Sequence, residues 1–196
     1  MTAFKKKKLK LYLPLLVLLV VSLFLLRGLW LDPKKLPSVF IHKPLPHFNL
    51  PTLEHVRSGS EKIPFNEFMN NATFQGKPWV LNVFASWCQA CVQEHVYLMQ
   101  IAKKNSIQLV GLAYKDDPDA TLNWLTKHGN PYNTVLVDES GRAGIEFGVY
   151  GVPETFLITS EGLVNYKHVG PIDADFFTQH INPLIQMDAT QNDHSQ

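Results

Sequence analysis

The two cysteines of this 196-residue chain, Cys88 and Cys91, lie three positions apart, and the chain has no other cysteine. A disulfide between them closes so small a ring that it constrains little of the unfolded chain, so it cannot join distant parts of a fold. It can instead open and close locally. The segment before the pair, residues 79–85, is apolar and β-prone, and residues 92–101 have the apolar spacing of an amphipathic helix. Between a strand and a helix, this cysteine spacing is typical of thiol–disulfide exchange.

Composition limits the other interpretations of the cysteine pair. A structural zinc site would need two further ligands, and no other cysteine is present, so we expect no metal. Two buried, unreactive thiols do not fit a motif that begins a helix. The net charge of +1 indicates no particular affinity for nucleic acid, and the hydrophobic content of 45% allows one ordinary domain plus appendages.

The N-terminal part of the chain has the pattern of a membrane anchor. Lysines at positions 5–8 and 10 precede an apolar stretch over residues 11–31, which as a helix would span about 31 Å, close to the thickness of a bilayer core. A cleaved signal peptide is the alternative, but residues 24–30 are bulky and contain no small-x-small cleavage site. We therefore expect residues 1–10 in the cytoplasm, a retained transmembrane anchor at 11–31, and the remainder in a bacterial periplasm, where disulfides persist.

Changes in composition divide the rest of the chain into three parts. Residues 32–46 contain four prolines and are expected to form a stiff, extended periplasmic linker. Residues 47–187 have the apolar patterning of a globular domain. Residues 188–196 are polar, and we expect them to form a disordered tail.

Within residues 47–187, the periodicity predicts strands and helices in alternation. Strands are expected at 48–53, 77–85, 107–114, 134–138, 154–159 and 163–169, and helices at 64–70, 89–104, 118–128, 142–147 and 173–185. A turn at 160–162 should join the last two strands as an antiparallel hairpin. This order predicts an α/β domain in which helices flank a central mixed β-sheet. The predicted apolar face of helix 89–104 consists of Val92, Val96, Met99 and Ala102.

Two motifs carry a resemblance to a known family. The segment 82–91, ending in Trp-Cys-Gln-Ala-Cys, is typical of the thioredoxin superfamily, whereas the segment 147–158, which contains Gly-Val-Tyr-Gly-Val-Pro-Glu-Thr, is much more specific. Together they resemble the membrane-anchored DsbE/CcmG thiol:disulfide interchange proteins of bacterial cytochrome c maturation. Residues 76–78, 114–117, 129–132 and 166–170 also fit this family. The resemblance implies a thioredoxin-like fold and extends from the anchor to about residue 184.

The resemblance implies roles for the residues around the cysteines. Cys88, at the start of the helix, should be the nucleophile, and Cys91 should resolve the mixed disulfide. Pro153 is expected to be a cis-proline facing the disulfide, with the backbone at Val152 pairing with a bound substrate strand. Trp87 is expected to be a surface aromatic that shields the disulfide; simple packing is its alternative role.

The two residues between the cysteines, Gln89 and Ala90, add no charge. The helix N-terminus should therefore be the main stabiliser of the Cys88 thiolate. We expect a pKa nearer to that of thioredoxin, about 7, than to that of DsbA, about 3.5. Such a thiol indicates a reductant or a moderate exchanger.

The resemblance also implies an acidic residue near the cysteines. Asn82 occupies the strand position at which thioredoxins carry a buried Asp that helps to move the proton of the second cysteine, and an amide cannot do this. We expect Asn82 to be a buried, satisfied amide. The acidic role is assigned to Glu154, whose alternative is an exposed residue at a strand start. Glu94 is a second candidate, although the spacing of Glu94 and His95 is that of solvated helix residues.

The leading functional hypothesis is an enzyme that keeps the haem-attachment cysteines of apocytochrome c, or the disulfide of a partner, reduced. The resemblance implies apocytochrome c or a cytochrome c maturation thiol protein as substrate, and a membrane reductant of the DsbD/CcdA type as electron donor. It implies contact with inner membrane lipid and no cofactor beyond the cysteine pair itself. One alternative is a general periplasmic disulfide oxidase or isomerase. Another is a copper-binding assembly factor on the same fold, with Cys88, Cys91 and a histidine such as His168 as ligands.

Overall fold

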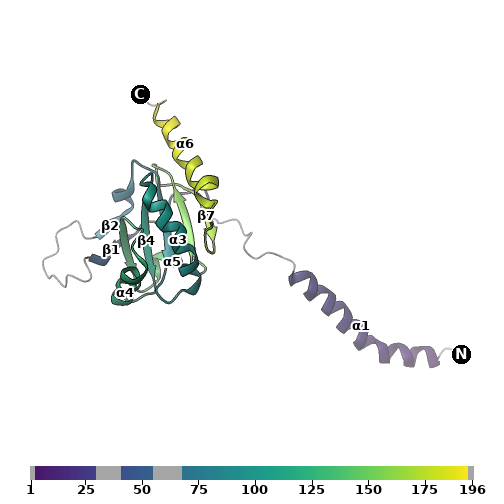
Figure 1. The fold of residues 1–196 in the computed structure, drawn as a ribbon. Helices are drawn as coiled ribbons and strands as arrows, with labels where there is room; N and C mark the ends of the chain where they lie inside the picture. Colours follow the sequence, from purple (N-terminus) through teal and green to yellow (C-terminus); the bar gives the residue numbers. More distant parts are fainter. Residues whose placement is uncertain (1–2, 30–40, 55–67, 194–196) are drawn as a thin grey trace. The chain divides into compact units, whose positions relative to one another are not determined.

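The structure is a computed structural model that describes residues 3–29, 41–54 and 68–193. The chain forms two compact units, Met1–Pro37 and Ser38–Gln196 (Figure 1).

The described part of the first unit is one helix, α1 (Ala3–Leu29), which continues through Pro14. Large apolar side chains between Tyr12 and Leu26 are exposed along it. By the length and apolarity that a bilayer crossing requires, no helix within the described ranges qualifies as a membrane span.

The second unit is built on a five-stranded sheet with the strand order β5-β4-β3-β6-β7. Its strands are β3 (Trp79–Phe84), β4 (Gln108–Tyr114), β5 (Thr134–Asp138), β6 (Glu154–Ile158) and β7 (Val164–Val169). β3, β4 and β5 are parallel, whereas β6 is antiparallel to both of its neighbours. The sheet is therefore mixed, as predicted, and β6 and β7 form the expected hairpin.

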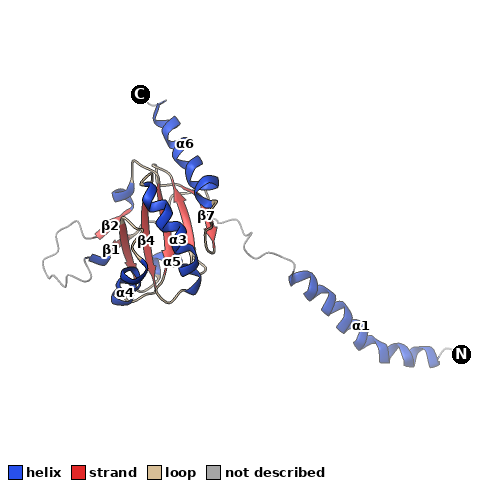
Figure 2. Cartoon of the chain, in the orientation of Figure 1, coloured by secondary structure: helices blue, strands red, loops and turns tan. Residues whose placement is uncertain are grey.

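Helices cover both faces of this sheet (Figure 2). They are α3 (Gln89–Lys104), α4 (Pro118–His128), α5 (Arg142–Glu146), the π-helix η4 (Phe177–Ile181) and α6 (Asn182–Asp193). Side chains alternate along β3, so Val80 and Phe84 face one hydrophobic cluster, and Leu81 and Val83 face the other. The first cluster includes residues of α3, α4 and α6, and the second includes residues of α5. Asn82 thus lies on the α3 face of the sheet.

Local sequence signals determine where the helices α3 and α4 begin and end. α3 starts after its N-cap Cys88 and ends at Asn105, which has the left-handed conformation common at helix C-termini. α4 is capped by Asp117, whose side chain accepts a hydrogen bond from Ala120 N, and Pro118 occupies its first turn. Both helices have the predicted bounds.

A short two-stranded sheet replaces a predicted helix. β2 (Phe68–Asn70) pairs antiparallel with β1 (Asn49–Pro51), where the sequence predicted a helix over residues 64–70. Residues 64–67 lie outside the described residues. A short helix does form, but directly after the predicted one: it is the 3-10 helix η3 (Asn71–Phe74). Asn70 is its N-cap and accepts a hydrogen bond from Ala72 N.

The predicted linker and tail also differ from the structure. At the end of the predicted linker, Pro44 forms a bridge with Leu163, and the buried Leu45 donates a backbone hydrogen bond to Gly162 O. This part of the linker therefore packs on the domain. At the other end, α6 continues to Asp193, so residues 188–193 of the predicted disordered tail are helical. No proline or glycine occurs in residues 184–193, so the helix of the preceding turns extends without a helix-breaking residue.

The buried face of α3 differs from the predicted one. It consists of Cys91, Glu94, His95, Leu98 and Ile101. Val96, which was predicted to be buried, is 53% exposed, and Met99 is only half-buried. Glu94 and His95 form hydrogen bonds inside the domain. These bonds turn the face that carries Glu94 and His95 toward the interior, and Val96 is left exposed.

Candidate active site

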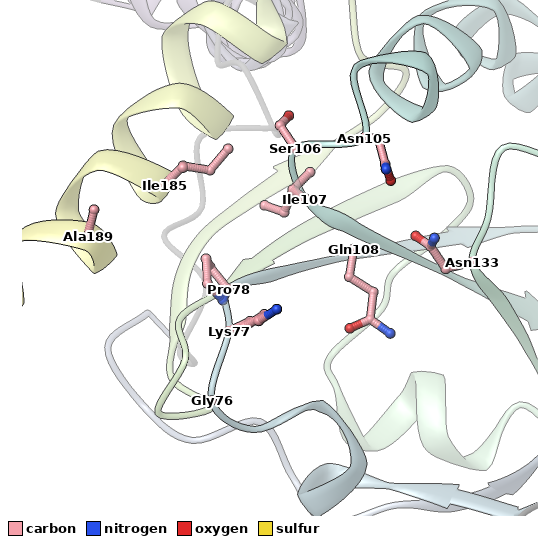
Figure 3. Close-up of a pocket in the computed structure, with 10 residues that line it drawn as sticks. All are labelled: Gly76, Lys77, Pro78, Asn105, Ser106, Ile107, Gln108, Asn133, Ile185 and Ala189. Atoms are coloured by element: carbon pink, nitrogen blue, oxygen red, sulfur yellow. The ribbon is translucent and has the colours of Figure 1, made fainter. Parts of the chain in front are cut away.

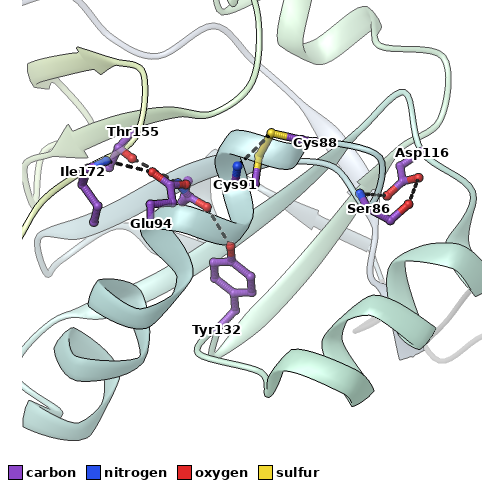
Figure 4. Close-up of a disulfide and its surroundings, with 9 residues drawn as sticks. Ser86, Cys88, Cys91, Glu94, Asp116, Tyr132, Thr155 and Ile172 are labelled. Atoms are coloured by element: carbon purple, nitrogen blue, oxygen red, sulfur yellow. Dashed lines mark hydrogen bonds between the residues drawn. A yellow bond between two sulfur atoms is a disulfide. The ribbon is translucent and has the colours of Figure 1, made fainter.

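The two cysteines form a disulfide at the N-terminus of α3, directly after the turn that leaves β3 (Figure 4). Cys88 is the N-cap residue, and its Sγ accepts a hydrogen bond from Cys91 N at 3.1 Å. Cys88 is 5% exposed and Cys91 1%. A substrate sulfur therefore reaches Cys88 more easily, which supports its predicted role as the nucleophile.

The turn before the cysteines is held by Asp116, a residue that the sequence analysis did not single out. Its carboxylate accepts hydrogen bonds from Ser86 N at 2.7 Å and Ser86 Oγ at 2.7 Å. It also accepts one from Thr121 Oγ1 at 2.8 Å, so it joins this turn to α4. Trp87 is 60% exposed, and its Nε1 donates to Lys115 O at 3.1 Å. Trp87 is thus the surface aromatic that was expected beside the disulfide.

The Val152–Pro153 peptide bond is cis, as predicted. The pairing of β3 with β6 ends with Val83 opposite Glu154. One further step in this register sets Pro153 opposite Phe84, at the point where β3 ends and the cysteine turn begins. Pro153 therefore lies beside the end of β3, from which the chain leads to the disulfide.

Asn82 lies at the centre of a buried hydrogen-bond network on the α3 face, and its partners Glu94, Tyr132 and Thr155 are labelled in Figure 4. Its Nδ2 donates to Glu94 Oε1 at 2.8 Å and to Thr155 Oγ1 at 3.1 Å. Its Oδ1 accepts from the Tyr132 hydroxyl at 2.7 Å. The amide is fully buried and bonded at both ends, which confirms the prediction for Asn82.

Glu94 is fully buried, contrary to the expectation of a solvated helix residue. Its second oxygen accepts a hydrogen bond from Ile172 N at 3.0 Å. Burial raises the pKa of Glu94 to about 7, although the hydrogen bonds from Asn82 and Ile172 act in the opposite direction. Glu94 follows Cys91 by three residues on the same buried helix face. A carboxyl group with a pKa near 7 can change its protonation state at neutral pH, and this one lies one helical turn after Cys91.

Tyr132 takes part in this network as a hydrogen-bond donor. Burial and the nearby charge of Glu94 raise the pKa of the Tyr132 hydroxyl well above its usual value. The hydroxyl therefore stays protonated and donates to Asn82. Because the amide oxygen is occupied in this way, the amide nitrogen must face Glu94 and Thr155.

His95 is also buried, with 4% exposure. Its Nε2 lies 3.0 Å from Gly129 O, and its ring packs edge-on against Trp124 with centroids 4.7 Å apart. Its Nδ1 has no hydrogen-bond partner in the described part of the chain. Burial lowers the pKa of His95, and nearby His128 lowers it further. His95 is therefore a neutral packing residue that links α3 to α4.

Glu154 is buried, so the exposed alternative does not hold, yet it does not join the Asn82 network. Thr155 points to the α3 face, and side chains alternate along β6, so Glu154 points to the opposite face with Phe156. There its Oε2 lies 2.9 Å from Lys167 Nζ in an ion pair. The buried carboxyl group that joins the Asn82 network, on the Cys91 side of the sheet, is that of Glu94.

A histidine and a pocket lie outside the cysteine motif. His168, a copper ligand in one alternative hypothesis, has its Nε2 3.2 Å from Pro171 O, and no three His, Cys, Asp or Glu residues in the described ranges gather as a metal site. A pocket of about 580 Å³ is lined by Lys77, Gln108 and Ile185, among others (Figure 3). It lies where β3 and β4 begin, whereas the disulfide follows the end of β3.

Comparison with known proteins agrees with this geometry. The Redoxin family model matches residues 44–180. The thiol:disulfide interchange protein DsbE of Allochromatium vinosum is 40% identical over 88% of this chain and 91% of its own length. The DsbE of Pseudomonas aeruginosa is 39% identical over 92% of this chain and 94% of its own.

A solved structure shares the fold. It is a secreted Mycobacterium tuberculosis disulfide oxidoreductase that is homologous to E. coli DsbE. It is 25% identical to this chain with a TM-score of 0.57, and the match covers 70% of this chain and 96% of the other. With the disulfide at the helix N-terminus, these matches show that the chain belongs to the Redoxin family and, within it, to the DsbE thiol:disulfide interchange proteins, which makes it a thiol–disulfide oxidoreductase.

Proposed function

We propose that this oxidoreductase is a periplasmic reductant that keeps the haem-attachment cysteines of apocytochrome c reduced. The observation that carries the proposal is the electrostatic setting of the cysteines. The residues between them are uncharged, and the buried carboxyl group nearest to them along α3 is that of Glu94. An acidic neighbour disfavours a thiolate, and a dithiol without strong thiolate stabilisation is a better electron donor.

The proposed reaction transfers two electrons from the reduced pair to a substrate disulfide. The Cys88 thiolate attacks one substrate sulfur, the substrate S–S bond breaks, and the leaving thiolate takes a proton from solvent. Cys91 then gives its proton to ionised Glu94 and attacks the Cys88 sulfur of the mixed disulfide. The second substrate thiolate leaves and is protonated. The chain ends with the Cys88–Cys91 disulfide.

The disulfide must then be reduced again, and we assign this step to a membrane thiol reductant of the DsbD/CcdA type. The same proposal places the domain in the periplasm and residues 11–31 as its anchor in the inner membrane. The lysines at 5–8 and 10 ahead of an apolar run support this orientation. The exposed apolar side chains of α1 support an apolar environment around it.

The reduction potential of the full-length protein against glutathione tests the direction of electron flow. A reductant should have a potential near that of thioredoxin, about −270 mV, and far below that of DsbA, about −120 mV. A potential close to that of DsbA would favour the general oxidase instead.

The substrate and the anchor need separate tests. The reduced protein should reduce an oxidised Cys-x-x-Cys-His peptide faster than the same peptide with the histidine replaced by alanine. Equal rates would remove the support for apocytochrome c as the preferred substrate. Protein extracted from membranes should retain its N-terminal residues, and a mature N-terminus near residue 28 would show that the segment is a cleaved signal.

A further inference from the structure

A buried ion pair lies on the sheet face opposite to Glu94. Lys167 of β7 and Glu154 of β6 have side chains that are 2% and 0% exposed, and the Nζ–Oε2 distance is 2.9 Å. Removing two charges from water is costly, so such a pair is a weak source of stability by itself. No hydrogen bond reaches Glu154 Oε2 from the described residues, and Lys167 is its ionic partner. The role of Lys167 and Glu154 is therefore inferred from the other groups to which they form hydrogen bonds.

Both side chains hold the loop that precedes Pro153. Lys167 Nζ donates a hydrogen bond to Gly148 O at 2.6 Å. Glu154 Oε1 accepts hydrogen bonds from Tyr150 N at 2.9 Å and from Gly151 N at 3.3 Å. One ion pair thus fixes a carbonyl at the start of the loop and two amides near its end. Such charge-assisted bonds are about twice as strong as neutral ones.

The loop presents an aromatic side chain to solvent. The Tyr150 ring centroid lies 4.7 Å from Lys167 Nζ, which is a cation–π contact, yet Tyr150 is 73% exposed. A tyrosine that is held by its backbone and covered on one side loses little conformational freedom when a partner binds its free side. Aromatic residues of this kind contribute strongly to protein–protein contacts.

The position of the loop relates Tyr150 to the disulfide. The register of β3 and β6 leads from Val83 opposite Glu154 to Pro153 opposite Phe84, beside the turn into the cysteine motif. A polypeptide whose cysteine has reached Cys88 is therefore near Pro153, the residue that directly follows this loop. Glutathione disulfide carries only a tripeptide on each sulfur, so its reaction with Cys88 should depend less on Tyr150 than the reaction of a long polypeptide does.

We propose that Lys167 is a positioning residue that, with Glu154, holds the loop so that Tyr150 contacts the polypeptide around the reacting cysteine of a protein substrate. The inference rests on the exchange activity alone and is independent of the direction of electron flow. It predicts discrimination between polypeptide and small-molecule disulfides.

The test compares two disulfide substrates of the reduced full-length protein. One is a peptide of defined sequence with an internal Cys-x-x-Cys disulfide, and the other is glutathione disulfide. Lys167→Met and Tyr150→Ala should each lower kcat/KM for the peptide about tenfold, mainly through KM, as expected for loss of a central aromatic contact. Both should leave the glutathione disulfide rate, and the equilibrium constant of the cysteine pair with glutathione, within about twofold of the wild type.

Two controls separate positioning from folding. Lys167→Arg keeps the charge and the N–H donors and should restore the peptide rate that Lys167→Met loses. Ile145→Ala changes another exposed apolar side chain, 59% exposed on α5, and should alter neither rate. If Lys167→Met does not fold, Tyr150→Ala still decides the matter, because removing a largely exposed side chain leaves the fold intact.

The proposal is overturned if Tyr150→Ala leaves the peptide rate unchanged, or if Lys167→Met lowers both substrate rates equally. These outcomes differ from failure of the proposed function. A reduction potential near that of DsbA would contradict the proposed role as a reductant. The variants would still be expected to lower the rate with the peptide and not the rate with glutathione disulfide.

Discussion

Asn82 of β3 and Glu94 of α3 are joined by a hydrogen bond of 2.8 Å in the interior of the domain, between Asn82 Nδ2 and Glu94 Oε1. On β3 the buried polar residue is therefore an amide, Asn82, and the buried carboxylic acid is Glu94 of α3, one helical turn after Cys91. The amide is neutral, so it does not add a second charge to the site. The buried acid has a pKa of about 7 and can change its protonation state at neutral pH.

Glu94 should make the stability of the domain fall as pH rises. Its pKa is 4.5 in the ordinary state and about 7 in the folded protein, so between these values the folded state binds the extra proton. The contribution of Glu94 to stability is therefore largest below about pH 4.5 and is lost as pH rises from there through about 7, by an amount on the order of 3 kcal/mol. Urea unfolding at pH 5 and pH 8 should show a smaller loss for Glu94→Gln than for the wild type. The same loss in both proteins would contradict the assignment.

The same substitution should slow the resolution of mixed disulfides. A glutamine side chain at this position cannot accept the proton of Cys91, so release of substrate from Cys88 should slow about tenfold or more, as for loss of a general base. Rapid quenching followed by separation of the mixed disulfide measures this step. Glu146→Gln, which changes an exposed glutamate on α5, is the matched control. Equal release rates in wild type and Glu94→Gln would exclude this role.

The two cysteines should behave differently when each is removed. Cys91→Ala retains the more exposed thiol at the helix N-terminus and should trap mixed disulfides with substrate. Cys88→Ala retains only the less exposed Cys91 thiol and should trap almost none. Non-reducing gels after acid quenching measure both. Equal trapping by the two variants would mean that the nucleophile is wrongly assigned.

His95 should cause the opposite pH dependence to Glu94. Its folded pKa is lower than the ordinary 6.5, so the unfolded state binds more protons below pH 6.5. The contribution of His95 to stability is then complete above pH 6.5 and is lost as pH falls toward the folded pKa. Unfolding measured at pH 7 and pH 5 should show less acid destabilisation in His95→Gln than in the wild type. His47→Gln, at an exposed position, should lose as much stability between pH 7 and pH 5 as the wild type does. If His95→Gln also loses as much, His95 is not the group responsible.

Asp116 should be a major determinant of stability at the cysteine turn. Asp116→Ala leaves the Ser86 amide and two hydroxyl groups without their acceptor. The expected loss is at least about 2 kcal/mol, since hydrogen bonds to charged groups contribute more than neutral ones. Thermal or urea unfolding measures it, with Asp175→Ala at an exposed site as the control. A loss no greater than that of the control would show that the turn holds without this carboxylate.

Local chemistry was sufficient to predict most of the architecture. The bounds of α3 and α4 follow from capping residues and apolar periodicity, which act over a few neighbouring residues. The five strands of the main sheet were predicted for the same reason. Less regular segments were not: β2 was mistaken for a helix, and α6 extends into the polar residues that suggested disorder. Short strands exist only through their pairing, which local sequence does not contain.

The sequence by itself determined the cysteine motif, the order of the five strands of the main sheet and the satisfied amide at Asn82, whereas the cis-proline was expected from the family resemblance. Only the tertiary structure decided which carboxyl group lies on which face of the sheet. Glu94 is buried because Asn82, 12 residues away, and Ile172, 78 residues away, supply its hydrogen bonds. Glu154 is buried on the other face because Lys167 meets it there. Burying a charge-bearing group depends on such distant partners, and these come together only when the chain folds.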